Sequence, residues 1–197
     1  MSTSVFFFGG FGANADNMKV WLDTARAQKS KVDFNAFPYP DAGPDDTEAV
    51  AGFKQLKSVA DTIAKSRADL IYIVGHSSGC AIANAVDDKL KDHSKIALIT
   101  LDGFVPDKDQ RGRDSTKLWS AQCKNNDKLT AVHFATLSSV AGANLQLYKP
   151  TDCNDQTNKW SLHFSLVNKS ASTVKITDVS QGYQKCQANL CWLTKEA

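Results

Sequence analysis

Short apolar runs alternate with segments of helical period along the first half of the chain. Four runs have the length and composition of strands: Val5 to Phe8, Val32 to Phe37, Leu70 to Val74 and Ile96 to Leu101. Between them, apolar residues recur every three or four positions: Met18, Leu22 and Ala25; Val50, Phe53, Leu56, Val59 and Ile63; Ile82, Val86 and Leu90. This alternation predicts an α/β fold, a mostly parallel sheet with helices on both faces and right-handed crossovers. Ligands bind such sheets at the carboxyl ends of the strands.

The second half of the chain is less regular. Residues 129–137 favour another strand, residues 116–125 and 140–147 favour short helices, and residues 173–179 favour a last strand. No repeat, low-complexity tract or linker divides the sequence. We therefore expect a single domain over residues 1–197 with a sheet of about six strands.

Composition narrows the classes of function. The 197 residues, 42% hydrophobic and 22% charged, are enough for one domain with a buried core. The charges almost balance, with 23 Lys+Arg against 21 Asp+Glu, and form no block that would indicate a nucleic-acid partner. No apolar run approaches the length of a membrane-spanning helix, and the N-terminus lacks the basic region of an export signal. We expect a soluble cytoplasmic protein.

The cysteines leave the compartment open to a second interpretation. The chain has five, an odd number without the Cys-x-x-Cys or Cys/His spacing of a zinc site, so no metal is expected. Free thiols in a reducing compartment are the first interpretation. The alternative is one or two disulfides among the last four, which would indicate a periplasmic or secreted protein: Cys123, Cys153, Cys186 and Cys191.

The strongest chemical motif is Gly75-His76-Ser77-Ser78-Gly79, a G-x-S-x-G directly after one predicted strand and directly before a predicted helix. On such a tight turn the central serine adopts a strained backbone angle that exposes its hydroxyl above the sheet. The two glycines leave room for the close approach of strand and helix. Ser77 is therefore the candidate nucleophile.

A serine hydroxyl needs a base within hydrogen-bond reach. Of the four histidines, His76 lies inside the turn and His93 lies in a lysine-rich stretch typical of a solvated surface. His163 follows a long loop after the predicted strands and is the preferred base. His133, within a strand-like run, is the alternative.

The base in turn needs a carboxylate that fixes its tautomer. Asp102 directly follows the predicted strand at residues 96–101, next to the strand that leads to Ser77, so it is expected at the same edge of the sheet. Asp152 and Asp155, in a later loop, are the alternatives.

A glycine-rich segment, Gly9-Gly10-Phe11-Gly12, follows the first predicted strand. The tetrahedral intermediate of acyl transfer needs two preorganised N–H donors, and we assign them to the backbones of Ser78 and Phe11. The glycines match neither the dinucleotide fingerprint nor a phosphate-binding P-loop, so no cofactor is expected.

Together these segments resemble the α/β-hydrolase superfamily, and within it the thioesterase-like branch. Phe8 to Asn14 is similar to the family's oxyanion loop, Gly75 to Gly79 to its nucleophile elbow, and Leu101-Asp102-Gly103 to the position of the triad acid in thioesterases. His163-Phe164-Ser165-Leu166 resembles the family's histidine and following helix. The resemblance implies a catalytic triad of Ser77, Asp102 and His163 that hydrolyses a small-molecule carboxylic ester or thioester through an acyl-enzyme.

The sequence also departs from the family. The predicted sheet is smaller, the lid is reduced to about residues 106–126, and a strand is predicted at residues 173–179 where the family ends with a helix. The alternative function is a non-catalytic protein of the same fold that binds a small ligand in the open cleft. A reachable histidine distinguishes the two, because an inactive relative commonly lacks one.

Overall fold

The computed structural model describes residues 1–101, 132–135, 167, 188, 190, 192 and 193. Its strands in this part of the chain are β1 (Thr3–Phe8), β2 (Val32–Phe37), β3 (Leu70–His76), β4 (Ile96–Leu101) and β5 (Val132–Ala135). Its helices there are α1 (Ala15–Gln28), α2 (Asp46–Gly52), α3 (Leu56–Lys65) and α4 (Gly79–Asp87). The helices expected at residues 116–125 and 140–147 and the strand expected at residues 173–179 lie outside the described residues.

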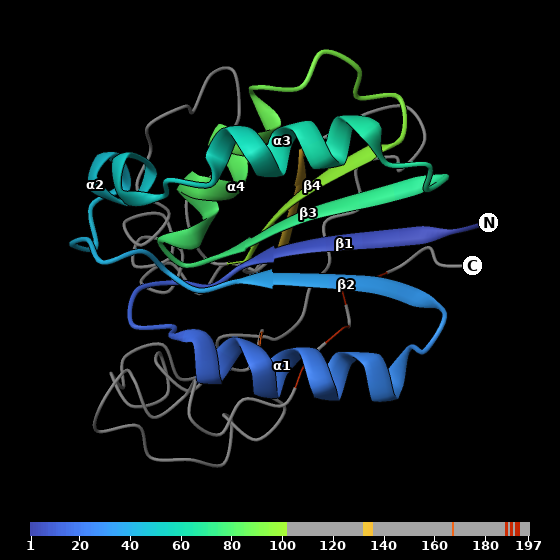
Figure 1. Ribbon diagram of the computed structural model, residues 1–197, viewed down its shortest axis with the longest axis horizontal. Coiled ribbons are helices and arrows are strands. Elements are labelled where there is room, and N and C mark those ends of the chain that lie inside the picture. Colours follow the sequence, from blue (N-terminus) through green and yellow to red (C-terminus); the bar gives the residue numbers. More distant parts are fainter. Residues whose placement is uncertain (102–131, 136–166, 168–187, 189, 191, 194–197) are drawn as a thin grey trace, which may run out of the picture.

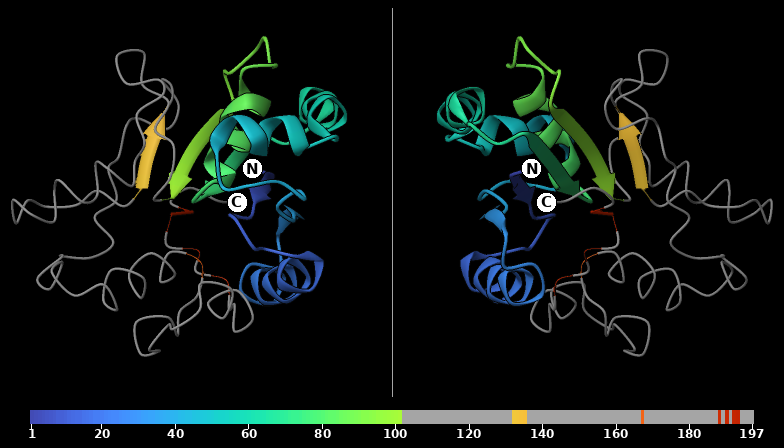
Figure 2. Two further views of the ribbon diagram at one scale, coloured as in Figure 1. Left: turned by 90° about the vertical axis from the view of Figure 1, so that its left-hand side faces the viewer. Right: turned by 90° about the vertical axis from the view of Figure 1, so that its right-hand side faces the viewer.

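The strands form one sheet in the order β2-β1-β3-β4-β5. The first four are parallel, and β5 pairs antiparallel with β4. Helix α1 covers one face, while α3 and α4 cover the other (Figures 1 and 2). The predicted α/β class, the mostly parallel sheet and the helices on both faces are confirmed. The sixth expected strand lies outside the described residues.

Chain order reverses direction between β1 and β3. From β1 the chain moves outward to β2 through α1, and from β3 it moves the opposite way to β4 through α4. The loops that leave β1 and β3 therefore diverge to opposite faces at the carboxyl edge, the place where sheets of this kind bind ligands. The glycine segment at residues 9–12 and the turn at Ser77 are these two loops.

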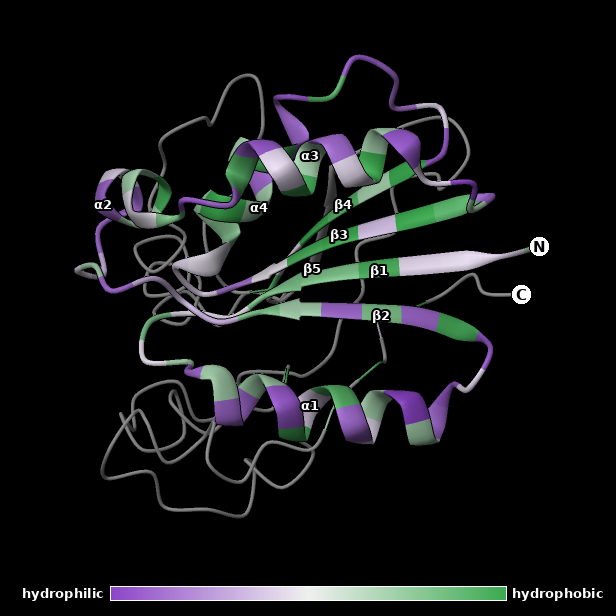
Figure 3. Ribbon diagram, in the orientation of Figure 1, coloured by the Kyte–Doolittle hydropathy of each residue, from purple (hydrophilic) through white to green (hydrophobic). Residues whose placement is uncertain are grey.

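The inner strands β1, β3 and β4 are largely apolar on both faces because helices cover both, whereas β2 also carries Asp33 and Asn35 (Figure 3). On the α1 face, the Phe7 ring stacks on Trp21 at a centroid distance of 4.2 Å, and Trp21 meets Phe34 edge-on at 5.8 Å. On the other face, Phe53 packs edge-on against Phe8 at 5.5 Å. These buried aromatic contacts hold the carboxyl ends of β1 and β2 in place.

The helical period over residues 50–63 resolves into two helices, α2 and α3, instead of one. The chain leaves the helical region after Gly52, at Phe53, where ψ is 85°. Gly52 has low helix propensity, and the break lets the Phe53 ring reach the core against Phe8 and Phe37. Helix α2 is capped at its start by the Asp45 carboxylate, which accepts hydrogen bonds from the backbone N–H groups of Thr47 and Glu48.

Part of the C-terminal segment packs on the α1 side of the sheet. Trp192 is fully buried and its ring lies 6.2 Å from that of Tyr72 on β3. Tyr72 shares its sheet face with Phe34, since both are in register with Val5. The Gln28 amide at the end of α1 also donates to the Ala188 carbonyl at 2.8 Å. In the described part of the chain, no helix is long and apolar enough to cross a membrane.

Candidate functional site

Ser77 lies between the end of β3 and the start of α4, at the carboxyl edge of the sheet. Its φ of 53° is the only positive value at a non-glycine residue among the described residues. Its backbone N–H donates to the Leu101 carbonyl at 2.9 Å, and its carbonyl accepts from the Cys80 N–H at 3.0 Å. These bonds to β4 and α4 hold a conformation that costs a non-glycine residue about 1 kcal/mol or more. The side chain keeps part of its surface exposed.

Both glycines of the motif are required by close backbone contacts. A Cβ atom on Gly75 would lie 2.4 Å from the Cα of Cys80. A Cβ atom on Gly79 would lie 2.5 Å from the carbonyl oxygens of Phe8 and Gly9. The first contact is strand against helix within the turn. The second places the start of α4 directly against the end of β1, and thus brings the Ser77 turn next to the glycine segment.

The glycine segment is itself held at both ends. The Gly9 N–H donates to the Phe37 carbonyl at 3.0 Å, and the Ala13 N–H donates to the Gly10 carbonyl at 2.9 Å. Gly12 has a φ of +85°, which favours glycine. Between these points the Phe11 side chain is 45% exposed, a large apolar ring left at the carboxyl edge.

The loop between β2 and α2 braces the turn from a third side. The Ser78 hydroxyl donates to the Pro44 carbonyl at 3.0 Å, and the Tyr39 hydroxyl donates to the Gly43 carbonyl at 2.7 Å. Burial raises the pKa of Tyr39 above its usual value, and a hydrogen bond with Ser78 offsets part of that rise. The Tyr39 ring also meets Phe11 edge-on at 5.8 Å. Tyr39 thus links the glycine segment to the residue after Ser77.

Sequence reasoning missed this brace. Its signal is Pro38, Pro40 and Pro44, which indicate a rigid loop after the second strand. The contact with Ser78 spans 34 positions of sequence and has no local pattern.

Two of the four histidines, His76 and His93, lie where they cannot act as the base for Ser77. His76 is fully buried at the end of β3, with partners of its own. His93 lies beyond α4, with its Nε2 atom 3.1 Å from the Asp87 carbonyl oxygen and 3.3 Å from the Asp87 carboxylate. Because α4 begins at Gly79 and rises about 1.5 Å per residue, Asp87 at its last position is about 12 Å from the turn. Neither histidine is placed to serve Ser77.

The remaining candidates are only partly described. Asp102 and His163 lie outside the described residues, as do Asp152 and Asp155. Asp102 directly follows Leu101, whose carbonyl accepts the Ser77 N–H. His133 lies on β5 in register with Thr100, one position from the carboxyl end of β4.

Cys80 is buried and forms no disulfide with a described residue, and its Sγ atom lies 3.7 Å from the Leu101 carbonyl oxygen. The other four cysteines lie outside the described residues. Within residues 1–101 and the short described segments beyond them, no group of three or more His, Cys, Asp or Glu side chains could hold a metal ion.

No family model matches the chain, and no curated protein matches it. One similar solved structure is an extracellular α/β-hydrolase from a Paenibacillus species, described as sharing structural and functional homology with tobacco salicylic acid binding protein 2. It is 16% identical over 96% of this chain and 67% of its own length, with a TM-score of 0.40. The interpretation of the site therefore rests on the geometry above.

Proposed function

We propose that the protein is a serine hydrolase that cleaves a small carboxylic ester or thioester through an acyl-enzyme. The observation that carries the proposal is the backbone of Ser77, which is held at a φ of 53° between a buried strand and a helix. Gly75 on the strand and Gly79 on the helix leave no space for a Cβ atom. Strain of this kind persists where surrounding contacts maintain it, and it is concentrated at functional sites. An ordinary glycine turn would place glycine at this position.

In the proposed mechanism the Ser77 hydroxyl attacks the substrate carbonyl while His163 accepts its proton. His163 then donates that proton to the leaving alcohol or thiol, and water repeats the sequence on the acyl-enzyme to release the carboxylic acid. Asp102 orients the imidazole and stabilises its protonated form. The bond from the Ser77 N–H to the Leu101 carbonyl supports this choice of acid, since it joins the turn to the residue next to Asp102.

Two backbone N–H groups, those of Ser78 and Phe11, are assigned to stabilise the negative charge that develops on the substrate carbonyl oxygen. The contact between Gly79 and the end of β1 supports this pair, because it brings the two loops together. The hydrogen bond from the Ser78 hydroxyl to the Pro44 carbonyl fits the same role, since it holds Ser78 against the loop after β2. The exposed Phe11 ring favours an apolar acyl group beside the turn.

Ester turnover tests the proposal. We expect the full-length protein to hydrolyse short p-nitrophenyl esters or acyl-CoA thioesters, and Ser77→Ala to lower kcat/KM by at least about a thousandfold. Ser58→Ala, at an exposed helical serine on α3, is the matched control and should retain full activity.

The choice of base is tested by His163→Ala against His133→Ala. Loss of turnover in His163→Ala alone supports His163 as the base. Loss of turnover in His133→Ala alone would show that His133 is the base instead. Full activity in both would contradict the triad. A folded protein that binds esters without turning them over would support the non-catalytic alternative.

A further inference from the structure

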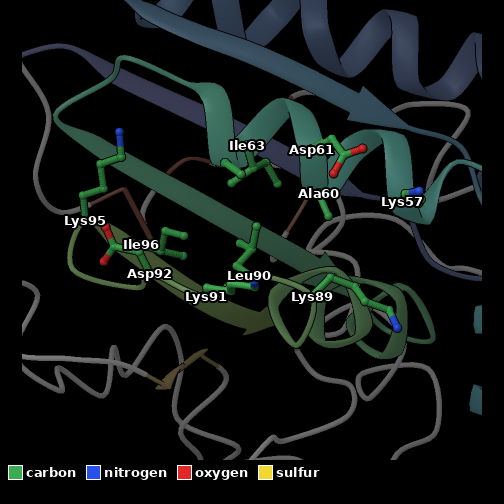
Figure 4. Close-up of a pocket in the computed structure, with 11 residues that line it drawn as sticks. Lys57, Ala60, Asp61, Ile63, Lys89, Leu90, Lys91, Asp92, Lys95 and Ile96 are labelled. Carbon is green, nitrogen blue, oxygen red and sulfur yellow. The ribbon is translucent and has the colours of Figure 1, made fainter.

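A hollow lies between α3 and the segment that follows α4 (Figure 4). Its volume is about 640 Å³, within the range of about 300 to 1,000 Å³ that is common for small-ligand sites. It reaches Ile96, the first residue of β4, whereas Ser77 is bonded to Leu101 at the end of that strand. Its lining includes no residue of the Ser77 turn, the glycine segment or the loop between β2 and α2, so the hollow is distinct from the proposed active site.

The floor of the hollow is aliphatic. Ile63 of α3, Leu90 after α4 and Ile96 of β4 line it, and all three are buried in the core below. On α3, Ala60 and Ala64 lie one turn apart facing the hollow, and their short side chains leave the space that larger residues would fill. Ala64 is exposed, so this side of the hollow is open.

The rim carries a surplus of positive charge. Four lysines line it, Lys57, Lys89, Lys91 and Lys95, against the two carboxylates of Asp61 and Asp92. The Lys95 ammonium donates to the Ser66 carbonyl at 2.6 Å, and the Asp92 carboxylate accepts from the Ser94 N–H at 2.9 Å.

The other three lysines, Lys57, Lys89 and Lys91, are exposed. Within the described part of the chain their ammonium groups make no ion pair or hydrogen bond. Their aliphatic stems can extend the apolar lining while the ammonium groups remain at the opening.

We propose that this hollow binds a linear amphipathic anion: an aliphatic chain against the floor, with a carboxylate or phosphate head held by the rim lysines. The aliphatic floor and cationic rim complement the two parts of such a ligand. The residues that line the hollow include no aromatic ring, so a nucleotide would lack a surface on which to stack its base.

Isothermal titration of the full-length protein tests the proposal with decanoate, decyl phosphate, decanol, acetate and inorganic phosphate, each below its micelle concentration. Decanoate or decyl phosphate should bind, and the tighter of the two identifies the head group. Octanoate should bind about tenfold more weakly than decanoate, from the loss of two buried methylenes. Acetate or inorganic phosphate binding as tightly as the ten-carbon anions would contradict a role for the floor.

Two variants localise the ligand. Ala64→Phe should fill the open side of the hollow and weaken decanoate at least tenfold, while Ala27→Phe, at an exposed alanine likewise in the last turn of a helix, should leave binding unchanged. Replacing Lys57, Lys89 and Lys91 together by Gln should weaken decanoate about tenfold and leave decanol unaffected. Equal decanoate affinity in the wild type and Ala64→Phe would overturn the assignment, because the ligand would then bind elsewhere, for example beside Ser77. The titration measures binding alone, so its outcome is independent of ester turnover.

Discussion

Replacing Ser77 by Gly and by Ala separates the backbone strain at the turn from the chemistry of the hydroxyl. Both substitutions remove the Oγ atom, so both should abolish ester turnover. They differ in the backbone, since glycine adopts a φ of 53° freely and alanine does not. The Gly variant should therefore be the more stable of the two.

The magnitude follows from two opposing effects. A left-handed φ costs a residue with a Cβ atom about 1 to 2 kcal/mol, which Gly avoids, while Gly loses about 0.5 to 1 kcal/mol more than Ala in chain entropy on folding. The difference is about 0.5 to 1 kcal/mol in favour of Ser77→Gly. For a chain of 197 residues this corresponds to a Tm about 2 °C higher.

Thermal unfolding followed by circular dichroism measures the difference. The matched control is the pair Ser58→Gly and Ser58→Ala within α3, where Gly should be the less stable variant by about 1 kcal/mol because the backbone there is helical. A Gly variant at residue 77 that is equal to or less stable than the Ala variant, with the normal order at residue 58, would refute the strain argument.

Three further perturbations test the surroundings of the turn. Gly79→Ala places a Cβ atom 2.5 Å from the carbonyl oxygens of Phe8 and Gly9, so it should cost about 2 to 3 kcal/mol in urea unfolding and abolish turnover; unchanged stability would contradict the close contact. Tyr39→Phe removes the hydroxyl that donates to the Gly43 carbonyl, so it should cost about 1 kcal/mol and lower kcat more than it changes KM; an unchanged kcat would show that the brace does not position Ser78. Hydrogen bonds from the Ser2 backbone and hydroxyl lower the pKa of Asp69 below its usual 3.8, so the ionised group stabilises the fold above that pH and the contribution is lost as the pH falls through the lowered pKa. Asp69→Asn should remove this part of the acid-induced fall in Tm, and an identical acid profile would contradict it.

Much of the sheet could be predicted because its strands are short apolar runs bounded by glycine, proline or charge. Residues 32–37 and 96–101 were expected as strands with the same bounds that the structure shows. The helix break at Phe53 could not be predicted from period alone, because its ring satisfies the helical spacing and also reaches Phe8 across the core. Local pattern does not report such a long-range contact.

The antiparallel direction of β5 is a similar case. Residues 129–137 were expected as a strand, and the structure confirms one at Val132–Ala135. An apolar run looks the same in either direction, so its antiparallel pairing with β4 follows only from the path of the chain.

At the site, the turn could be predicted and its support could not. The glycines around Ser77 are a local requirement, visible in five consecutive letters. Tyr39 and Pro44 act through contacts with Ser78 that join distant segments. Asp102, His163 and the alternatives His133, Asp152 and Asp155 remain predictions from chain order and spacing.

Labelling by a fluorophosphonate probe tests the central claim most directly, because only an activated serine displaces fluoride from phosphorus at a useful rate. We predict that the folded protein gains the mass of one probe less HF, that peptide mapping places the adduct on Ser77, and that Ser77→Ala takes up none. The Ser58→Ala control should label like the wild type. A folded wild-type protein that gains no adduct, or gains it equally in Ser77→Ala, would contradict the proposal that Ser77 is a nucleophile.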